Sequence, residues 1–226
     1  MTAWLTTAND ILRRAPWVTR SHESRRTLAA LLAQLVLFGV LYGIAMGSLR
    51  GLVAQSQWLE QMVYSAIKVP LLLTATFLLS LPSFYVINSL LGLRRDLGSA
   101  VRALVAAQAG LAIVLASLAP FTLLWYASST KYSQALVFNG GMFAIASFSA
   151  QWLVRQYYRP LIARNPRHRS VLWCWLVVYS LVGIQMAWLL RPFIGMPNAP
   201  VRFLRPDPWD NAYEFVARLV WHTLFP

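Results

Sequence analysis

A few amide side chains stand inside long uncharged segments of this sequence, and they are its first candidates for chemistry. An amide can hydrogen-bond a neutral solute, so these residues could line a narrow pore or a substrate cavity. More often such residues bond one membrane helix to another, at about 1 kcal/mol or less each. We favour this structural interpretation and keep the other as an alternative. The amides are Gln34, Asn88, Gln108, Asn139, Gln151 and Gln185.

The residue types that carry catalysis or ion transport are missing from the same segments. None of the segments contains Asp, Glu, Lys, Arg or His, so a proton-coupled transporter and a voltage sensor are poorly supported. The three histidines, His22, His168 and His222, fall outside the segments and on two different sides, which excludes a histidine-based intramembrane protease. The single cysteine, Cys174, excludes a cysteine-rich metal framework. We therefore expect no enzyme, no cofactor and no metal site.

Five uncharged segments must position the amides. Each has at least 21 residues, and roughly 20 apolar residues in a helix suffice to cross a hydrocarbon core about 30 Å thick. The chain is 58% hydrophobic and 12% charged, whereas about a quarter of a soluble domain is charged. A soluble bundle of five buried helices is the alternative, but the segments show no charged face. We predict an all-α polytopic membrane protein, a bundle of five transmembrane helices over 27–49, 69–93, 103–127, 132–154 and 170–190.

Basic residues are concentrated on one side of the predicted spans. Thirteen stand before the first span, between the second and third, and between the fourth and fifth, against seven on the other side. By the positive-inside rule, the N-terminus is cytoplasmic and the C-terminus is outside. The net charge of +13 is distributed over three cytoplasmic flanks, where arginine clusters meet anionic lipid headgroups. Without a basic stripe with interleaved aromatics, we expect no nucleic-acid partner.

The flanking segments predict short helices at the membrane surface. Residues 1–26 form a cytoplasmic amphipathic segment, or alternatively an unstructured tail, in which four apolar residues can share one face of a helix ended by Pro16. These are Trp4, Leu5, Ile11 and Leu12. The segment before Pro70 predicts an outer interfacial helix that turns into the second span at this proline. Residues 191–226 form an outward-facing tail with an amphipathic helix over 208–225.

Four residues directly after the last span are candidates for anchoring that tail. They are Arg191, Pro192, Phe193 and Gly195. We expect them to fix where the tail leaves the membrane. The Arg191 side chain is long and cationic, so it could reach a lipid phosphate or an acidic tail residue such as Asp207 or Asp210.

Small residues recur at every fourth position of the first span. A spacing of four advances the position by roughly 40° around a helix, so Gly39, Gly43 and Gly47 form one narrow glycine strip. Such a pattern lets two membrane helices approach closely. The fourth span offers a counterpart in Gly140, Ala144, Ser147 and Gln151. We predict that the first span packs on the fourth, or alternatively that the strip is a homodimer face.

The layout resembles the Yip family in its five spans, cytoplasmic N-terminus, outward C-terminus and glycine-rich first helix. The local similarity runs from "YGIAMGSLRG" through "AIKVPLLLTATFLLSLPSFYVINSLLGL", and "AWLLRPFIGMPNAPVRF" resembles an uncharacterised group of bacterial membrane proteins. The resemblance implies a membrane scaffold or adaptor in a bacterial inner membrane, although the C-terminal tail departs from the family's pattern.

These observations predict a non-catalytic inner-membrane protein that is a structural or accessory subunit of a membrane protein complex. It would bind another membrane protein or a second copy of itself through its glycine and alanine faces. The alternative is a small channel or carrier for a neutral solute, lined by Asn88, Gln108, Asn139 and Gln151. A lipid-modifying enzyme that uses His168 and the arginine-rich loop is less favoured, because no carboxylate accompanies that loop.

Overall fold

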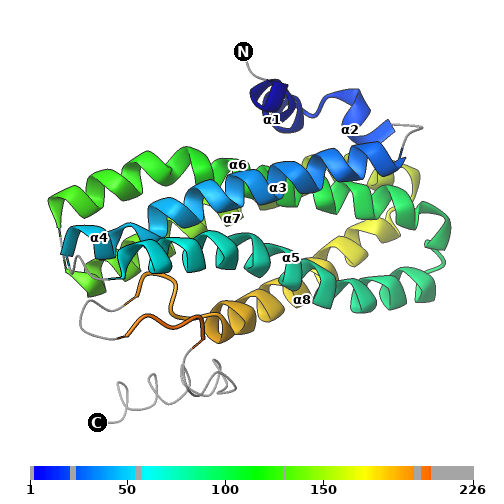
Figure 1. Cartoon of the computed structure of the whole chain (residues 1–226). Coiled ribbons are helices and arrows are strands. Elements are labelled where there is room, and N and C mark those ends of the chain that lie inside the picture. Colours follow the sequence, from blue (N-terminus) through cyan, green and yellow to red (C-terminus); the bar gives the residue numbers. More distant parts are fainter. Residues whose placement is uncertain (1–2, 21–23, 54–56, 130, 196–199, 205–226) are drawn as a thin grey trace, which may run out of the picture.

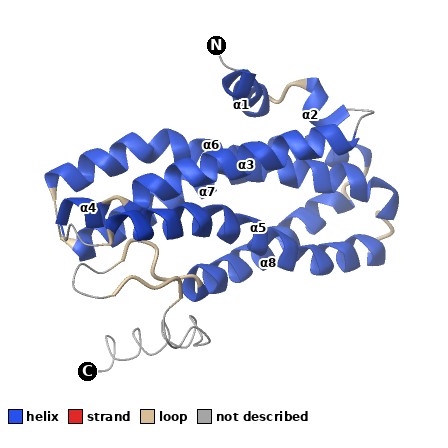
Figure 2. Ribbon diagram, in the orientation of Figure 1, coloured by secondary structure: helices blue, strands red, loops and turns tan. Residues whose placement is uncertain are grey.

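The structure is a computed structural model that describes residues 3–20, 24–53, 57–129, 131–195 and 200–204. The described residues form helices and no strand (Figure 2). Five of these helices are long and apolar enough to cross a membrane. They are α3 (Ser24–Gly47), α5 (Trp58–Leu90), α6 (Leu97–Ser128), α7 (Tyr132–Arg164) and α8 (Arg167–Leu189). The predicted all-α fold of a multi-pass membrane protein is thereby confirmed.

The second long helix begins well before its predicted start. The segment before Pro70 was expected to be a separate interfacial helix, but α5 is continuous from Trp58 and contains both Pro70 and Pro82. Proline removes a backbone donor from a helix, yet neighbouring helices in a membrane protein can accommodate it. Gly39 of α3 lies next to Pro70, and a Cβ at position 39 would lie 3.2 Å from the Cβ of Pro70. The missing side chain of Gly39 therefore leaves space for the proline ring.

The helices follow one another in space in an order that differs from their order in the chain. α3 packs between α5 and α6, α7 packs on α6, and α8 packs on α5. α7 and α8 are joined by residues 165–166 but make few contacts with each other, and α8 runs diagonally across the bundle (Figure 1). The bundle is therefore an incomplete ring, α8–α5–α3–α6–α7, in which the first and last helices diverge.

The two ends of the bundle differ in their connections. At one end, called the α4 end, the short helix α4 (Leu49–Val53) follows α3, and α8 leads into residues 191–204. At the other, the η1 end, the 3-10 helix η1 (Arg94–Asp96) joins α5 to α6. The tail helix expected over 208–225 lies outside the described residues.

The N-terminal segment forms two short helices that rest on the bundle, α1 (Ala3–Arg13) and α2 (Pro16–Arg20). Ile11 is fully buried, and its carbonyl oxygen accepts a hydrogen bond from the hydroxyl of Tyr157 at 2.6 Å. The side-chain amide of Gln34 donates to the carbonyl oxygen of Trp4 at 3.3 Å. Trp4 and Leu5 are about half exposed, so Ile11 faces the protein while its predicted companions face outward.

α6 lies at the centre of the packing. Its N-terminal half is rich in alanine, and Ala100, Ala103, Ala106 and Ala109 are all almost completely buried. Small side chains let membrane helices approach closely. Both α3 and α7 accordingly pack along α6.

Candidate functional site

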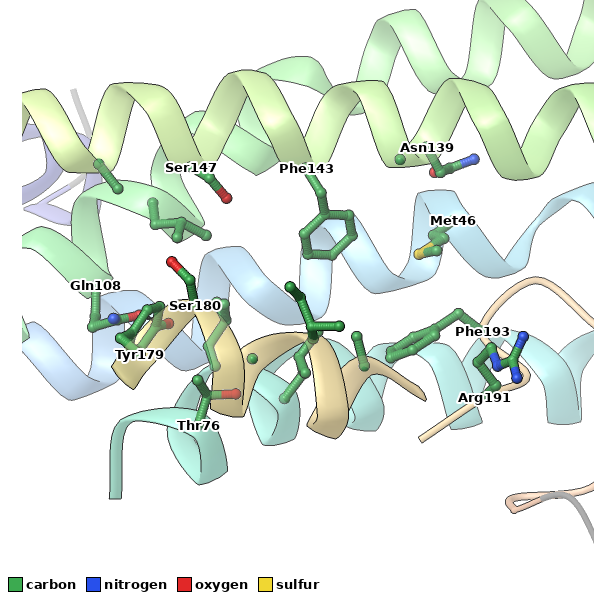
Figure 3. A pocket seen from close by; sticks show the side chains of 18 of the residues that line it. Met46, Thr76, Gln108, Asn139, Phe143, Ser147, Tyr179, Ser180, Arg191 and Phe193 are labelled. Carbon is green, nitrogen blue, oxygen red and sulfur yellow. Dashed lines mark hydrogen bonds between the residues drawn. The ribbon is translucent and has the colours of Figure 1, made fainter. Parts of the chain in front are cut away.

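The divergence of α7 from α8 leaves a cavity of about 1090 Å³ inside the bundle (Figure 3). Its walls come from α5, α6, α7 and α8, with Met46 contributed by α3. The lining residues of α8 run from Trp175 to Ala187, about 18 Å of helix, and those of α7 run from Tyr132 to Val154, about 33 Å. Most of the lining side chains are apolar, so the cavity is long and predominantly hydrophobic.

The predicted polar lining is only partly found at this cavity. Gln108, Asn139 and Gln151 border it, whereas Asn88 does not. Asn88 is fully buried, and its side-chain nitrogen donates to the carbonyl oxygen of Phe84 in the same helix at 2.8 Å. Gln108 accepts a hydrogen bond from the hydroxyl of Tyr179 at 2.9 Å, which joins α6 to α8 across the cavity.

Asn139 is the centre of a buried hydrogen-bond network. Its Oδ1 accepts from the hydroxyl of Tyr42 at 3.0 Å, and its Nδ2 donates to the hydroxyl of Tyr126 at 2.7 Å and to the carbonyl oxygen of Ala135 at 2.8 Å. Tyr126 in turn donates to the carbonyl oxygen of Met46 at 3.1 Å. These bonds join α3, α6 and α7, so the network supports the structural interpretation of this amide.

The glycine strip of α3 lies against α5. A Cβ at Gly43 would lie 2.7 Å from the Cα of Ala66, and one at Gly47 would lie 2.8 Å from the Cα of Met62. Both distances are shorter than van der Waals contact, so only glycine allows this approach. The prediction that the strip packs on the fourth span is wrong, because its neighbour is the antiparallel helix that follows it in the chain.

The small-residue face of α7 has no helix packed against it in the described part of the chain. A Cβ at Gly140 would meet no described heavy atom within 4 Å, and Ala144 is exposed. Gly140, Ser147 and Gln151 border the cavity instead (Figure 3 labels Ser147). Three of the four residues expected to receive the first span therefore form part of the cavity wall, and Ala144 lies outside it.

The residues predicted to anchor the tail are held by α5. Lys68 donates from Nζ to the carbonyl oxygen of Pro192 at 2.5 Å, and Gln61 donates from Nε2 to that of Phe193 at 2.8 Å. The hydroxyl of Ser65 donates to the same Phe193 oxygen. Gln61, Ser65 and Lys68, here called the tail clasp, are all fully buried.

The sequence reasoning missed the tail clasp because it treated Lys68 as a charge flanking the second span. Gln61, Ser65 and Lys68 are spaced by four and then three residues, which places them on one face of a helix. That spacing is visible in the sequence. It was not recognised because the segment before Pro70 was expected to be a separate helix at the membrane surface.

The same tail residues form one end of the cavity, here called the cavity mouth. The cavity mouth consists of Arg191, Pro192, Phe193, Gly195, Pro200 and Arg202. The guanidinium of Arg191 lies over the ring of Trp188, 3.3 Å from its centroid. Gly195 has φ +73°, and a Cβ there would lie 2.7 Å from Cδ of Gln61. Both the backbone conformation and the contact with the tail clasp require glycine.

A second polar pair lies near η1, far from the cavity mouth. Nε2 of His168 is 3.2 Å from Oδ2 of Asp96, and the imidazole is fully buried. The expectation that no carboxylate accompanies His168 is therefore wrong. Since the ring is inaccessible, the pair joins the start of α8 to η1 rather than forming a reactive site. Among the described residues, no group of three His, Cys, Asp or Glu side chains is placed to hold a metal.

Comparison with protein-family models, curated proteins and solved structures finds no match to this chain. The likeness to the Yip family stays a prediction from the sequence.

Proposed function

We propose that the chain is a non-catalytic accessory protein of the membrane that acts by holding an elongated apolar molecule of the bilayer in its cavity. The single observation that carries this proposal is the hydrophobic cavity of about 1090 Å³ between α5, α6, α7 and α8. Ligand sites are commonly about 300–1,000 Å³ and mostly apolar, with a few polar groups. A cavity of this kind fits a lipid or another long hydrocarbon better than a hydrated solute.

The dimensions of the cavity also favour a hydrocarbon chain. Its lining extends for about 18 Å along α8 and about 33 Å along α7, beside a hydrocarbon core about 30 Å thick.

Three buried oxygen atoms in the cavity wall support the presence of a bound molecule. Oγ1 of Thr76 and the Oε1 atoms of Gln61 and Gln151 have no hydrogen-bond partner among the described residues. Buried polar atoms are nearly always hydrogen-bonded. A bound molecule with a hydroxyl or ester group, or a water that accompanies it, would satisfy them.

A second candidate keeps the predicted role as a subunit of a membrane complex. Gly140 and Ala144 give α7 a smooth face on which no other described helix packs. Small residues favour close helix contacts in membranes. A helix of another membrane protein, or of a second copy of this chain, would contact this face at Ala144, beside the cavity that Gly140 borders.

We further propose that the η1 end faces the cytoplasm of a bacterium and that the protein lies in its inner membrane. Exposed arginines gather at the η1 end, in η1 itself and in the ends of α7 and α8 that adjoin each other there. At the α4 end, by contrast, Arg50 and Lys68 are buried. Because these two cations are buried, the exposed positive charge is concentrated more strongly at the η1 end. The positive-inside rule depends on this kind of asymmetry between the two ends. The cavity mouth then faces the outer leaflet.

The proposed function is tested by filling the cavity. Ser147→Phe introduces a ring into the cavity, and Ala144→Phe, one turn earlier on the exposed face, is the matched control. We expect the protein purified in mild detergent to retain lipid, measured by native mass spectrometry, and Ser147→Phe to lose most of it while Ala144→Phe retains it. Equal retention in wild type and Ser147→Phe would contradict the proposal.

The same variants separate the other candidates. Loss of a co-purifying membrane protein in Ala144→Phe, with lipid retained, would favour the subunit role. Flux of a neutral solute through wild-type proteoliposomes that is abolished by Ser147→Phe would instead favour a channel or carrier.

A further inference from the structure

We infer that the cavity selects a neutral hydrocarbon that carries a free hydroxyl group, and that four uncharged polar side chains bind this group deep inside the bundle. This inference rests on the proposed function and specifies the chemical class of the occupant. All four residues line the cavity. They are here called the polar belt and consist of Thr76 on α5, Ser147 and Gln151 on α7, and Ser180 on α8.

The polar belt lies at one level of the bundle. A Cβ added to Gly183 of α8 would lie 3.4 Å from Cγ2 of Thr76, which places Thr76 beside the turn of α8 that begins at Ser180. Ser147 and Gln151 are about one turn apart on α7. The hydroxyls of Ser147 and Ser180 point into the space between α7 and α8 from its two sides (Figure 3). Thr76 and Ser147 are near the midpoints of α5 and α7, so a group bound here lies about midway along the spans.

The hydroxyl of Thr76 is not used by the helix that carries it. A serine or threonine within a helix can donate to the carbonyl oxygen one turn earlier, as Ser80 does to Thr76 at 2.8 Å and Ser149 does to Ile145 at 3.0 Å. Oγ1 of Thr76, by contrast, has no hydrogen-bond partner among the described residues, although Thr76 is only 2% exposed. A buried hydroxyl is costly to leave unpaired, so we expect a bound polar group beside it.

The amide of Gln151 restricts the chemistry of that bound group. Its Oε1 is buried and also has no partner among the described residues. An amide oxygen only accepts hydrogen bonds, so it is satisfied by an O–H or N–H group and not by an ester or ether oxygen. The equivalent atom of Gln61 belongs to the tail clasp, about 22 Å from Thr76 along α5, and lies outside the polar belt. The polar belt therefore favours an occupant with a hydrogen-bond donor.

The surroundings of the polar belt favour a donor that is uncharged. The polar groups that the described residues supply at this level are hydroxyls and amides, and two of them, Gln108 and Tyr179, are already joined by a hydrogen bond at 2.9 Å. A charged group would exchange its hydration for neutral partners only. A hydroxyl, by contrast, can donate to Gln151 and accept from Thr76 at the same time. It is therefore the group that fits the belt best.

The cavity extends further on one side of the polar belt than on the other. From Ser147 its lining continues along α7 for about 22 Å to Tyr132, at the α4 end where the cavity mouth lies, but for only about 10 Å to Val154. Leu136 and Phe143 are among the apolar residues of the longer side. A hydrocarbon chain whose hydroxyl is bound at the belt would therefore extend toward the cavity mouth.

The test compares two probes that differ in a hydrogen-bond donor. The full chain is reconstituted in phosphatidylcholine vesicles with equimolar hexadecanol and its methyl ether, each carrying the same photoreactive diazirine at the methyl end of the chain. Crosslinks to the cavity-lining parts of α7 and α8 are quantified by mass spectrometry. We expect the alcohol to exceed the ether about three- to tenfold, which corresponds to about one net hydrogen bond. Most crosslinks on α7 should lie between Tyr132 and Phe143.

Thr76→Val combined with Ser147→Ala removes two hydroxyls of the polar belt. This double variant should bring the ratio close to one, and unchanged crosslinking of the ether would show that the cavity is intact. The matched control is Thr74→Val with Ser149→Ala, which removes one hydroxyl each from α5 and α7 at positions that do not line the cavity and should preserve the ratio. Gln151→Leu alone is a second variant, expected to lower the ratio at least about twofold.

The outcomes are distinguishable. Absence of crosslinks from either probe to the cavity would overturn the proposed function, and the inference with it. Equal crosslinking of both probes in the wild type, or an unchanged ratio in the double variant, would overturn the inference alone. Stronger crosslinking of hexadecanoic acid than of hexadecanol would show that the cavity selects a charge and not a hydroxyl. Suppression of the hexadecanol crosslinks by excess glycerol would overturn the hydrocarbon in favour of a small polyol.

Discussion

The buried ammonium of Lys68 donates a hydrogen bond to the carbonyl oxygen of Pro192 at 2.5 Å. This contact joins the first third of α5 to the segment that follows α8, more than 120 residues later in the chain. Gln61 and Ser65 add hydrogen bonds to the next carbonyl oxygen. The tail clasp therefore fixes one end of the cavity, and the segment it holds carries both arginines of the cavity mouth.

Loss of the charge at Lys68 should release this segment. Lys68→Met keeps an apolar stem of similar size but leaves the carbonyl of Pro192 without its donor. A hydrogen bond to a charged group contributes about 1.5–3 kcal/mol, so we expect opening of the segment to become about 10- to 100-fold more frequent. The measurement is the maleimide labelling rate of Ile194→Cys, a position buried in the folded protein, with Cys174 replaced by serine.

Lys131→Met is the control for that experiment, because Lys131 is an exposed lysine at the start of α7. It removes the same charge from the same end of the bundle and should leave the labelling rate unchanged. An equal acceleration by both substitutions would show that net charge, rather than the hydrogen bond to Pro192, controls the segment.

Gly43 and Gly140 occupy similar small-residue patterns but should respond oppositely to alanine. A Cβ at Gly43 would overlap the backbone of α5 at Ser65 and Ala66, and backbone atoms cannot move aside cheaply. We expect Gly43→Ala to lower the free energy of unfolding by about 1–3 kcal/mol, the usual range for overpacking. Gly140→Ala, which meets no described atom within 4 Å, should leave stability unchanged or slightly higher. Unfolding in detergent measures both, and a large loss for Gly140→Ala would contradict this prediction.

These two glycines show what could be predicted from the sequence. The spacing of Gly39, Gly43 and Gly47 correctly indicated a close approach between helices, because it depends only on helix geometry. The predicted partner of this strip, the fourth span, was wrong. A strip of small residues fits any smooth helix surface, and the face with Gly140 and Ala144 was only one of several such surfaces. The number of long helices was predictable because the hydrocarbon core requires long uncharged segments.

The cavity was beyond the reach of sequence reasoning. It exists because α8 packs on α5 and diverges from α7, and this depends on contacts between segments far apart in the chain. Arg191, Phe193 and Gly195 were singled out as a tail anchor, yet nothing in the sequence places them in the same cavity as Gln108 and Tyr179. The ends of α5 and α7 were predicted wrongly for a simpler reason, which is that the spans were bounded at the first charged residue. Both helices continue past the uncharged segments, so Lys68 lies inside α5 and Arg155 lies inside α7.

The network around Asn139 should contribute to stability cooperatively. Tyr42→Phe removes one hydrogen bond and should lower the free energy of unfolding by about 0.6 kcal/mol, a typical value within membranes. Asn139→Leu removes three and should lower it by about 1–3 kcal/mol. The double variant should lose less than the sum of the two, by about 0.6 kcal/mol, because the Tyr42–Asn139 bond is counted twice.

Unfolding of the four proteins of this cycle in detergent gives the coupling energy. Tyr85→Phe serves as the control, since Tyr85 is 43% exposed on α5, and it should show no coupling with Asn139→Leu. Exactly additive losses for Tyr42→Phe and Asn139→Leu would contradict the network.

The orientation of the bundle decides which leaflet can supply the occupant of the cavity. With η1 in the cytoplasm, as the arginine distribution favours, a membrane-impermeant maleimide added to intact cells should label Ser133→Cys but not Gly98→Cys, each with Cys174 replaced by serine. Both positions are exposed, and Gly98 has open space for the new side chain. Labelling of both after the cells are permeabilised is the control for reactivity. The reverse pattern in intact cells would place the cavity mouth in the inner leaflet.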